Sequence, residues 1–304
     1  MSLLDEGKNP GLGIRELHRR GITGRGVAIA IIDQDPLVDH MEYKDRLRLY
    51  EEIDPWKKPQ IHGAAAASIA AGKTVGVAPE ADIYCFAIRT DGGRKARSIA
   101  RSIDRILEIN RTLPKDRKIK VTATSCSWRP GEPGYEEADA ITRQAAEQGI
   151  FVVSTVTDRY YDFSYQGLGR IPGHDPDDAA SYSAGAWWVR EFDEWYPEGE
   201  KSRRLLFPMD SRTVASPSGE DVYTFYRVGG WSWCVPYIAG LYALALQVDG
   251  DLTAEEFARA ALETAQYART VVDGKELRLG PLINPVGLIA TLEHESTARG
   301  QMAP

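Results

Sequence analysis

The sequence predicts a single α/β domain with a mostly parallel central sheet and helices on both of its faces. Segments rich in β-branched and apolar residues alternate along the chain with segments of helical spacing. The β-type segments are continuous apolar runs, which is typical of parallel strands that are covered on both faces. The 304 residues contain no internal repeat and no low-complexity linker, so we expect one domain spanning residues 1–304.

The predicted elements follow one another in a regular order. Strands are expected at residues 27–32, 81–88, 119–128 and 150–156, and helices at residues 12–20, 62–72, 97–110, 136–148 and 253–265. A further buried helix begins near Ser232. Between residues 158 and 228 the pattern weakens, which predicts long loops and a few irregular strands. In such folds, the loops at the carboxyl ends of the strands build the site.

Composition and charge exclude several classes of function. The net charge of -7 argues against binding to nucleic acid or to an anionic membrane surface. The longest nearly apolar run, residues 233–248, is shorter than a bilayer requires, and the N-terminus lacks the features of a signal peptide. The three cysteines have no metal-ligand spacing, which predicts buried reduced thiols and a cytoplasmic protein. The oligomeric state is left open.

The glycine-rich stretch GITGRG, residues 21–26, does not indicate nucleotide binding. A dinucleotide-binding loop follows a strand and leads into a helix, whereas this stretch precedes the first predicted strand.

Three side chains occupy positions suited to nucleophilic catalysis. Asp33 ends a buried strand, His62 opens an alanine-rich helix, and Ser232 opens the long apolar helix. Each also has a plain structural explanation. An Asp at a strand end is usually a cap or turn residue, a lone His is more often structural, and Ser232 is suited to cap its helix.

The stretches around these residues resemble the subtilisin-like serine proteases. GRGVAIAIID resembles the strand that ends in the catalytic Asp of that family, and HGAAAASIAAGKTVGVAPEADIYCFAI resembles its His-Gly helix with the following turn and strand. GWSWCVPYIAG matches the pattern Gly-x-Ser-x-x-x-Pro-x-x-Ala-Gly, while SCSWRPG and GIFVVSTVTD fall where the family has its substrate-flanking strands. The three main stretches occur in the order of the family, and the similarity covers essentially the whole chain.

The resemblance implies a subtilisin-like fold and a serine endopeptidase. Ser232 would attack a peptide carbonyl, His62 would carry the proton to the leaving amine, and Asp33 would hold the imidazole. The backbone N–H of Ser232 would face the oxyanion from the helix N-terminus. The resemblance also implies that substrate is bound by Ser127, Trp128, Arg129, Ser154 and Thr155.

Departures from the family pattern cluster around these positions. Gln34 and Asp35 replace a glycine that usually follows the catalytic Asp. Trp231 and Trp233 flank the serine, where they either pack the helix start or narrow the cleft. Arg129 stands where a glycine lines the pocket; it either offers a charge to an acidic side chain or faces solvent.

Asp158 takes the place of the asparagine that donates to the oxyanion in the family. An ionised carboxylate accepts hydrogen bonds and cannot donate one to the oxyanion. The alternative is that the hydroxyl of Thr157 or Tyr160 supplies the donor instead. Two functions therefore stay open. One is a slow or narrowly specific intracellular endopeptidase whose activity optimum is displaced toward acid pH. The other is a catalytically weakened protein of the same fold that binds peptides or regulates a partner.

The sequence indicates no cofactor. The loop AGKTVGV, residues 71–77, lacks the oxygen-rich insertion that often holds calcium in the family, and Glu42 alone is a poor calcium site. No inhibitory prosegment is recognisable ahead of the domain. We expect a peptide or protein substrate as the partner and no obligatory metal.

Overall fold

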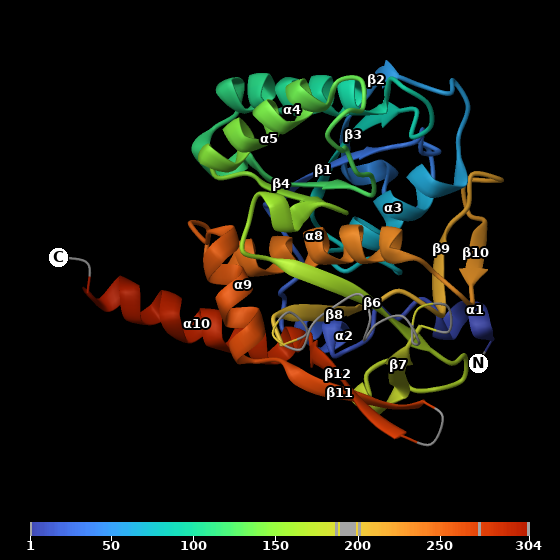
Figure 1. Ribbon diagram of the computed structural model, residues 1–304, viewed down its shortest axis with the longest axis vertical. Coiled ribbons are helices and arrows are strands. Elements are labelled where there is room, and N and C mark those ends of the chain that lie inside the picture. The colour runs from blue at the N-terminus through green and yellow to red at the C-terminus, as the bar shows by residue number, and fades with distance from the viewer. Residues whose placement is uncertain (1, 186–187, 189–198, 200–201, 273–274, 303–304) are drawn as a thin grey trace.

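A five-stranded parallel sheet forms the centre of the protein (Figure 1). The computed structural model describes residues 2–185, 188, 199, 202–272 and 275–302. The strands of the central sheet are β1 (Ala28–Asp33), β2 (Leu47–Asp54), β3 (Asp82–Ile88), β4 (Ile119–Thr124) and β5 (Phe151–Ser154). They lie in the order β2-β3-β1-β4-β5. Every residue of β1 is buried, as expected of a strand that is covered on both faces.

Four helices cover the two faces of the central sheet. They are α3 (Ile61–Ala71), α4 (Lys95–Thr112), α5 (Tyr135–Glu147) and α8 (Trp231–Val248). α4 and α5 pack together on one face, and α3 and α8 pack together on the other (Figure 1). Small residues bring α3 and α8 close, since a Cβ on Gly240 would lie 2.8 Å from the carbonyl oxygen of Ala70.

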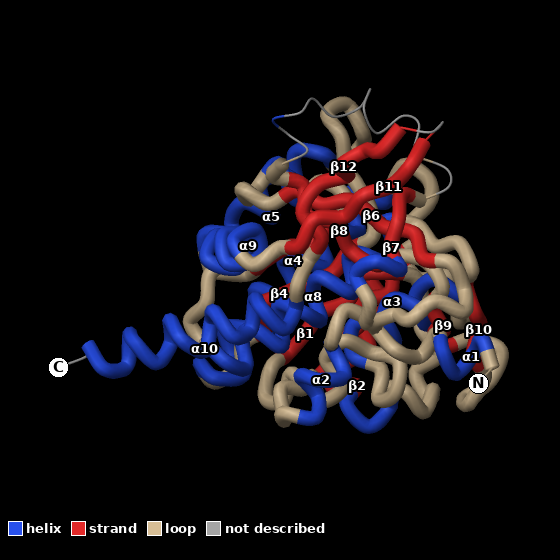
Figure 2. Tube along the Cα trace, turned by 90° about the horizontal axis from the view of Figure 1, so that it is seen from below, coloured by secondary structure: helices blue, strands red, loops and turns tan. Residues whose placement is uncertain are grey.

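A second five-stranded sheet lies on the far side of α8. Its strands are β6 (Ser164–Arg170), β7 (Tyr182–Ala184), β8 (Arg204–Pro208), β11 (Gln266–Val272) and β12 (Lys275–Leu282), in the order β11-β12-β8-β6-β7 (Figure 2). α8 contacts strands of both sheets, which explains why nearly all of its residues are buried. A separate antiparallel pair consists of β9 (Arg212–Ala215) and β10 (Tyr223–Tyr226).

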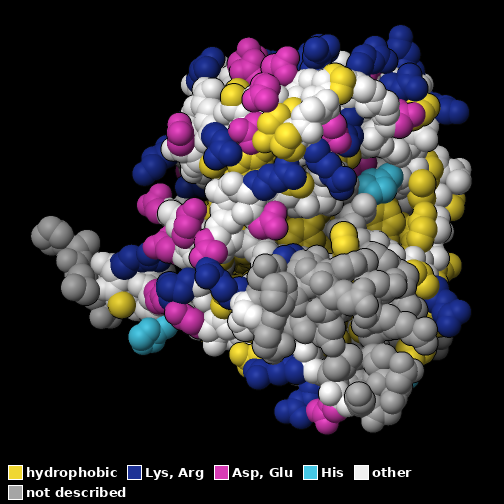
Figure 3. Space-filling model, in the orientation of Figure 1, with side chains coloured by type: hydrophobic (Ala, Val, Ile, Leu, Met, Phe, Trp, Pro, Cys, Tyr) yellow, Lys and Arg dark blue, Asp and Glu magenta, His cyan; other side chains and the backbone are white. Residues whose placement is uncertain are grey.

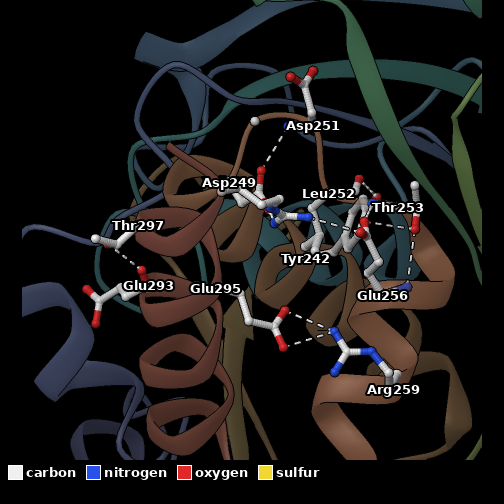
Figure 4. Close-up of polar contacts among 12 residues, drawn as sticks. Tyr242, Asp249, Asp251, Leu252, Thr253, Glu256, Arg259, Glu293, Glu295 and Thr297 are labelled. Carbon is white, nitrogen blue, oxygen red and sulfur yellow. Dashed lines mark hydrogen bonds and ion pairs between the residues drawn. The ribbon is translucent and has the colours of Figure 1, made fainter. Parts of the chain in front are cut away.

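The C-terminal helices are tied together by polar contacts (Figure 4). α9 (Ala254–Glu263) begins in a capping box between Thr253 and Glu256. Arg259 of α9 pairs with Glu295 of α10 (Pro285–Met302) at 2.9 Å. The Tyr242 hydroxyl of α8 donates to the carbonyl oxygen of Leu252 at 2.7 Å, which fixes the turn into α9.

Short elements complete the chain. They are α1 (Leu3–Glu6), α2 (Ile14–Arg19) and the 3₁₀ helices η1 (Lys44–Arg46), η2 (Lys115–Arg117), η3 (Thr157–Arg159) and η4 (Ala179–Ser181). None of the helices in the described ranges is long and apolar enough to cross a membrane.

The predicted α/β class and parallel sheet are confirmed, and the predicted helices and strands coincide with elements of the structure. Three strands were missed. β2 is an edge strand whose residues are half-buried or exposed, so it has no continuous apolar run. Polar residues and Arg269 interrupt β11, and three of the first four residues of β12 are charged. The segment between residues 158 and 228 is more regular than predicted, since its described part holds β6 to β10.

A buried carboxylate holds the loop that follows α3. Glu42 is 1% exposed and accepts hydrogen bonds from the backbone N–H of Thr74 at 2.7 Å and from the hydroxyls of Thr74 and Tyr223 at 2.5 Å. These donors occupy the positions around both oxygens that a cation would take. The contacts of Glu42 therefore do not fit a calcium ion. The expectation that the protein requires no metal stays a prediction.

Candidate active site

Asp33 and His62 meet at the carboxyl edge of the central sheet. Asp33 is the last residue of β1 and is 2% exposed, and His62 is the second residue of α3. His62 Nδ1 lies 2.7 Å from Asp33 Oδ1. From β1 the chain runs to β2 and β3 on one side and then crosses to β4 on the other, so this edge is a topological switch point. Crevices at such points are where α/β sheets bind ligands.

A close backbone contact at Gly63 brings the two side chains together. A Cβ at position 63 would lie 1.9 Å from the carbonyl oxygen of Gln34, a distance that no side chain tolerates. The start of α3 therefore rests directly on the segment that follows Asp33. Asp35 anchors that segment, since its carboxylate accepts the backbone N–H of Trp56 at 2.9 Å. The departure of Gln34 and Asp35 from the family pattern thus has a structural role.

Burial and the Asp33 carboxylate act on His62 in opposite directions. Burial lowers the pKa of the imidazole. The charge of Asp33 and its hydrogen bond together raise this pKa by more than burial lowers it, so the net pKa lies above the usual 6.5. Burial, assisted by the charge of Asp33, raises the pKa of the Cys85 and Cys126 thiols to about 12. All three cysteines are buried and free, as predicted.

Ser232 lies in the first turn of α8, which begins at Trp231 with Gly230 as its N-cap. The structural alternative, that Ser232 caps this helix, is wrong, because the helix begins at the residue before Ser232 and its N-cap is Gly230. Ser125 Oγ donates to the carbonyl oxygen of Ser232 at 2.9 Å and tethers the helix start to the end of β4. Among the described residues, the Ser232 hydroxyl makes no hydrogen bond with His62. Such bonds are often long before substrate binds.

The two tryptophans beside Ser232 have different roles. Trp233 is 6% exposed, and its ring centroid lies 5.1 Å from that of His62 and 5.3 Å from that of Tyr226. Trp231 is half-buried and lines a cavity. Of the two alternatives that the sequence left open, each applies to one tryptophan: Trp233 packs the helix start, and Trp231 narrows the cleft.

Two cavities lie at the site, and Trp231 at the start of α8 lines the second of them. The first, about 320 Å³, is lined by His62, Thr90, Lys95, Ser125, Cys126, Ser127 and Thr155. The second, about 160 Å³, is lined by Thr155, Thr157, Asp158, Phe163, Ser164, Tyr165, Gln166, Arg204 and Trp231. Thr155 borders both, so the cavities adjoin. Figure 3 shows a hollow with exposed hydrophobic side chains across the middle of this face.

The five predicted substrate-binding residues are not all placed to touch a substrate. Ser127 and Thr155 line the cavities. Arg129 is exposed, and its carbonyl oxygen accepts the backbone N–H of Glu132 in a turn, so its solvent-facing alternative is favoured. The cation that lines the larger cavity is Lys95, which the sequence analysis missed.

The predicted role of Trp128 and Ser154 in binding substrate needs a correction, because both residues are 0% exposed. The Trp128 indole donates to the Tyr160 hydroxyl at 2.6 Å, and the Ser154 hydroxyl accepts the backbone N–H of Val156 at 3.2 Å. Each side chain points into the core rather than into the cleft. Both residues therefore support the site without reaching a substrate through their side chains.

The alternative oxyanion donors are already engaged. Asp158 is exposed in η3 and lines the smaller cavity with Trp231. The Thr157 hydroxyl donates to the carbonyl oxygen of Ser154 at 2.7 Å, and the Tyr160 hydroxyl donates to Asp139 at 2.9 Å. Neither hydroxyl has a proton left for an oxyanion. The backbone N–H of Ser232 remains, because the first N–H groups of a helix have no partner within it.

Comparisons with known proteins agree with this fold. A sequence model of the subtilase family, the peptidases S8, matches residues 24–189. The chain is 27% identical over 286 residues to the subtilisin-like protease PopC of Myxococcus xanthus, an alignment that covers 83% of this chain and 58% of PopC. The chain thus spans less than two thirds of the length of that relative.

Two solved structures are similar over most of the chain. The subtilase cytotoxin SubAB matches with a TM-score of 0.67 and 16% identity, covering 96% of this chain and 98% of the other. A cold-adapted subtilisin-like serine proteinase matches with a TM-score of 0.56 and 16% identity, covering 86% and 89%. At this identity, the two structures establish the fold alone.

The balance between burial and Asp33 can be measured by NMR titration of the His62 imidazole. In the parent protein we expect a midpoint above pH 6.5, because the carboxylate stabilises the protonated ring. Asp33→Asn removes the charge and leaves burial unopposed, so the midpoint should fall below 6.5. Equal midpoints in the two proteins would contradict the proposed influence of Asp33.

Proposed function

Because the chain belongs to the subtilase family, we propose that it is a serine endopeptidase in which Asp33, His62 and Ser232 hydrolyse peptide bonds through an acyl-enzyme. The observation that carries the proposal is the 2.7 Å hydrogen bond between His62 Nδ1 and Asp33 Oδ1. This bond leaves Nε2 of the imidazole available as a base. His62 lines a cavity together with Ser125, and the Ser125 hydroxyl donates to the carbonyl oxygen of Ser232.

The reaction follows from the roles of these groups. The Ser232 hydroxyl attacks the peptide carbonyl carbon while His62 Nε2 accepts its proton. The tetrahedral oxyanion accepts a hydrogen bond from the Ser232 backbone N–H, where the helix N-terminus adds a favourable field. His62 then protonates the leaving amine. His62 next deprotonates a water molecule, which attacks the acyl carbon. The bond to Ser232 Oγ breaks as His62 returns the proton to Oγ, and Asp33 stays ionised throughout.

The surroundings of His62 support this role. Trp233 packs against the imidazole and, with Asp33, holds the ring at one end of the cleft. No metal or cofactor takes part in the proposed reaction, and its partner is a peptide or protein substrate. We propose an intracellular site of action on the basis of the free, buried cysteines.

A second candidate is a protein that binds peptides with little turnover, and the exposed carboxylate at Asp158 favours it. A missing oxyanion donor costs about a hundred- to a thousand-fold in kcat. The raised pKa of His62 adds a second restriction, because the imidazole is a base only after it has lost its proton. This argues against an acid-displaced optimum and for activity that increases toward alkaline pH.

The proposal is tested by fluorophosphonate labelling and peptide hydrolysis. The parent protein should be labelled at Ser232, with turnover unchanged by EDTA. Ser232→Ala should abolish labelling and lower kcat by about 10⁴- to 10⁶-fold, because the nucleophile is lost.

Ser218→Ala is the matched control, since Ser218 is exposed and lines neither cavity. It should retain labelling and turnover. Equal hydrolysis by the parent and by a folded Ser232→Ala variant would rule out Ser232 as the nucleophile.

Asp158→Asn separates the two candidates. An amide at this position can donate to the oxyanion, so kcat at neutral pH should increase by about ten- to a hundred-fold in a working but impaired peptidase. Asp162→Asn is the control, because Asp162 is exposed and pairs with Arg203 outside the cavities. If Asp158→Asn is no faster than the parent on any peptide, Asp158 does not occupy the oxyanion position.

A further inference from the structure

The larger cavity carries a cation next to the proposed base. Lys95 is the first residue of α4, and it lines the cavity together with His62 and the hydroxyl-bearing residues Thr90, Ser125 and Ser127. An ammonium group beside hydroxyls is a site for a carboxylate, because Lys95 and the hydroxyls of Thr90 and Ser127 can donate hydrogen bonds to it. The Ser125 hydroxyl already donates to the carbonyl oxygen of Ser232.

The ammonium of Lys95 is held loosely. Its Nζ lies 3.8 Å from Glu132 Oε2, which is longer than a hydrogen bond. The Lys95 side chain is 20% exposed and that of Glu132 is 35% exposed, so the pair is partly screened by water. Lys95 can therefore turn toward an arriving carboxylate at small cost.

Lys95 acts on the interior of the cavity. Burial and the charge of Asp33 raise the pKa of the Cys126 thiol, and the charge of Lys95 opposes them, so the ammonium lies within electrostatic range of the cavity wall.

The smaller cavity lacks this preference for acid. Its two charged residues, Asp158 and Arg204, have opposite signs, and Arg204 already donates to the carbonyl oxygen of Tyr165 at 3.1 Å. An acidic side chain entering there would meet the exposed carboxylate of Asp158. The charge distribution therefore directs an acidic residue to the cavity of Lys95.

We infer that Lys95 selects peptide substrates that carry Asp or Glu close to the cleaved bond, with the acidic side chain in the cavity beside His62. The inference rests on the proposed peptidase function. It assigns to Lys95 the acid preference that the sequence suggested for Arg129, whose side chain is exposed outside this cavity.

The test uses pairs of fluorogenic peptides that differ only by Glu or Gln, scanned over three residues on each side of the cleaved bond. At one position the parent should cleave the Glu peptide with a kcat/KM about tenfold higher, mainly through KM. Lys95→Met should reduce this ratio to about one, and Lys95→Glu should invert it. A ratio near one at all positions in the parent, or an unchanged ratio in Lys95→Met, overturns the inference.

Arg97→Met is the matched control. Arg97 lies on the same helix, its side chain is 61% exposed, and it pairs with Glu137 outside the cavity. The Glu-to-Gln ratio should be unchanged in this variant. A ratio that falls equally in Arg97→Met would assign the preference to the general charge of α4 and overturn the role of Lys95.

Failure of the proposed function is recognised separately. If the parent cleaves no peptide and Ser232 is not labelled, that function fails, and the role of Lys95 is then decided by binding. Fluorescence anisotropy on the Ser232→Ala variant should give about tenfold tighter binding of the Glu peptide, lost when Lys95→Met is added. Equal binding of the two peptides overturns the inference.

Discussion

The site depends on one close contact between two backbone segments. At Gly63 the start of α3 rests on the carbonyl oxygen of Gln34, where a Cβ would be only 1.9 Å away. The contact brings the first turn of α3 onto the end of β1 and sets the distance between the side chains of Asp33 and His62. The Asp33 carboxylate is buried by the same packing, so its interaction with the imidazole is little screened by water.

The rest of the site is arranged around this pair. α8 is buried between the central and the second sheet, and the hydrogen bond from Ser125 to Ser232 ties its first turn to β4. Trp233, in that turn, packs its ring against the imidazole of His62. The chemistry proposed for the protein thus uses positions that the packing of the α/β core already fixes. The two adjoining cavities differ in charge, which is the basis of the inferred preference for an acidic residue beside His62.

The fold and the pairing of Asp33 with His62 could be predicted from the sequence. The side chains that line the cleft could not. The fold follows from apolar runs and helical spacing, and the positions of Asp33 and His62 follow from the short motifs around them. Motifs do not report which way a side chain points. Trp128 and Ser154 lie beside cleft residues in the chain but turn into the core, whereas Lys95 reaches the cleft from a helix start that no motif marks.

The most direct test of this arrangement is the proton NMR spectrum of the Asp33–His62 hydrogen bond in Gly63→Ala. The parent protein should give a low-field resonance from the Nδ1–H of His62. Gly63→Ala should lose it while remaining folded, because the added methyl group forces α3 away from Gln34. Gly93→Ala is the control, since a Cβ there would lie 3.9 Å from its neighbour. A low-field resonance that persists unchanged in Gly63→Ala would contradict the dependence of the site on this contact.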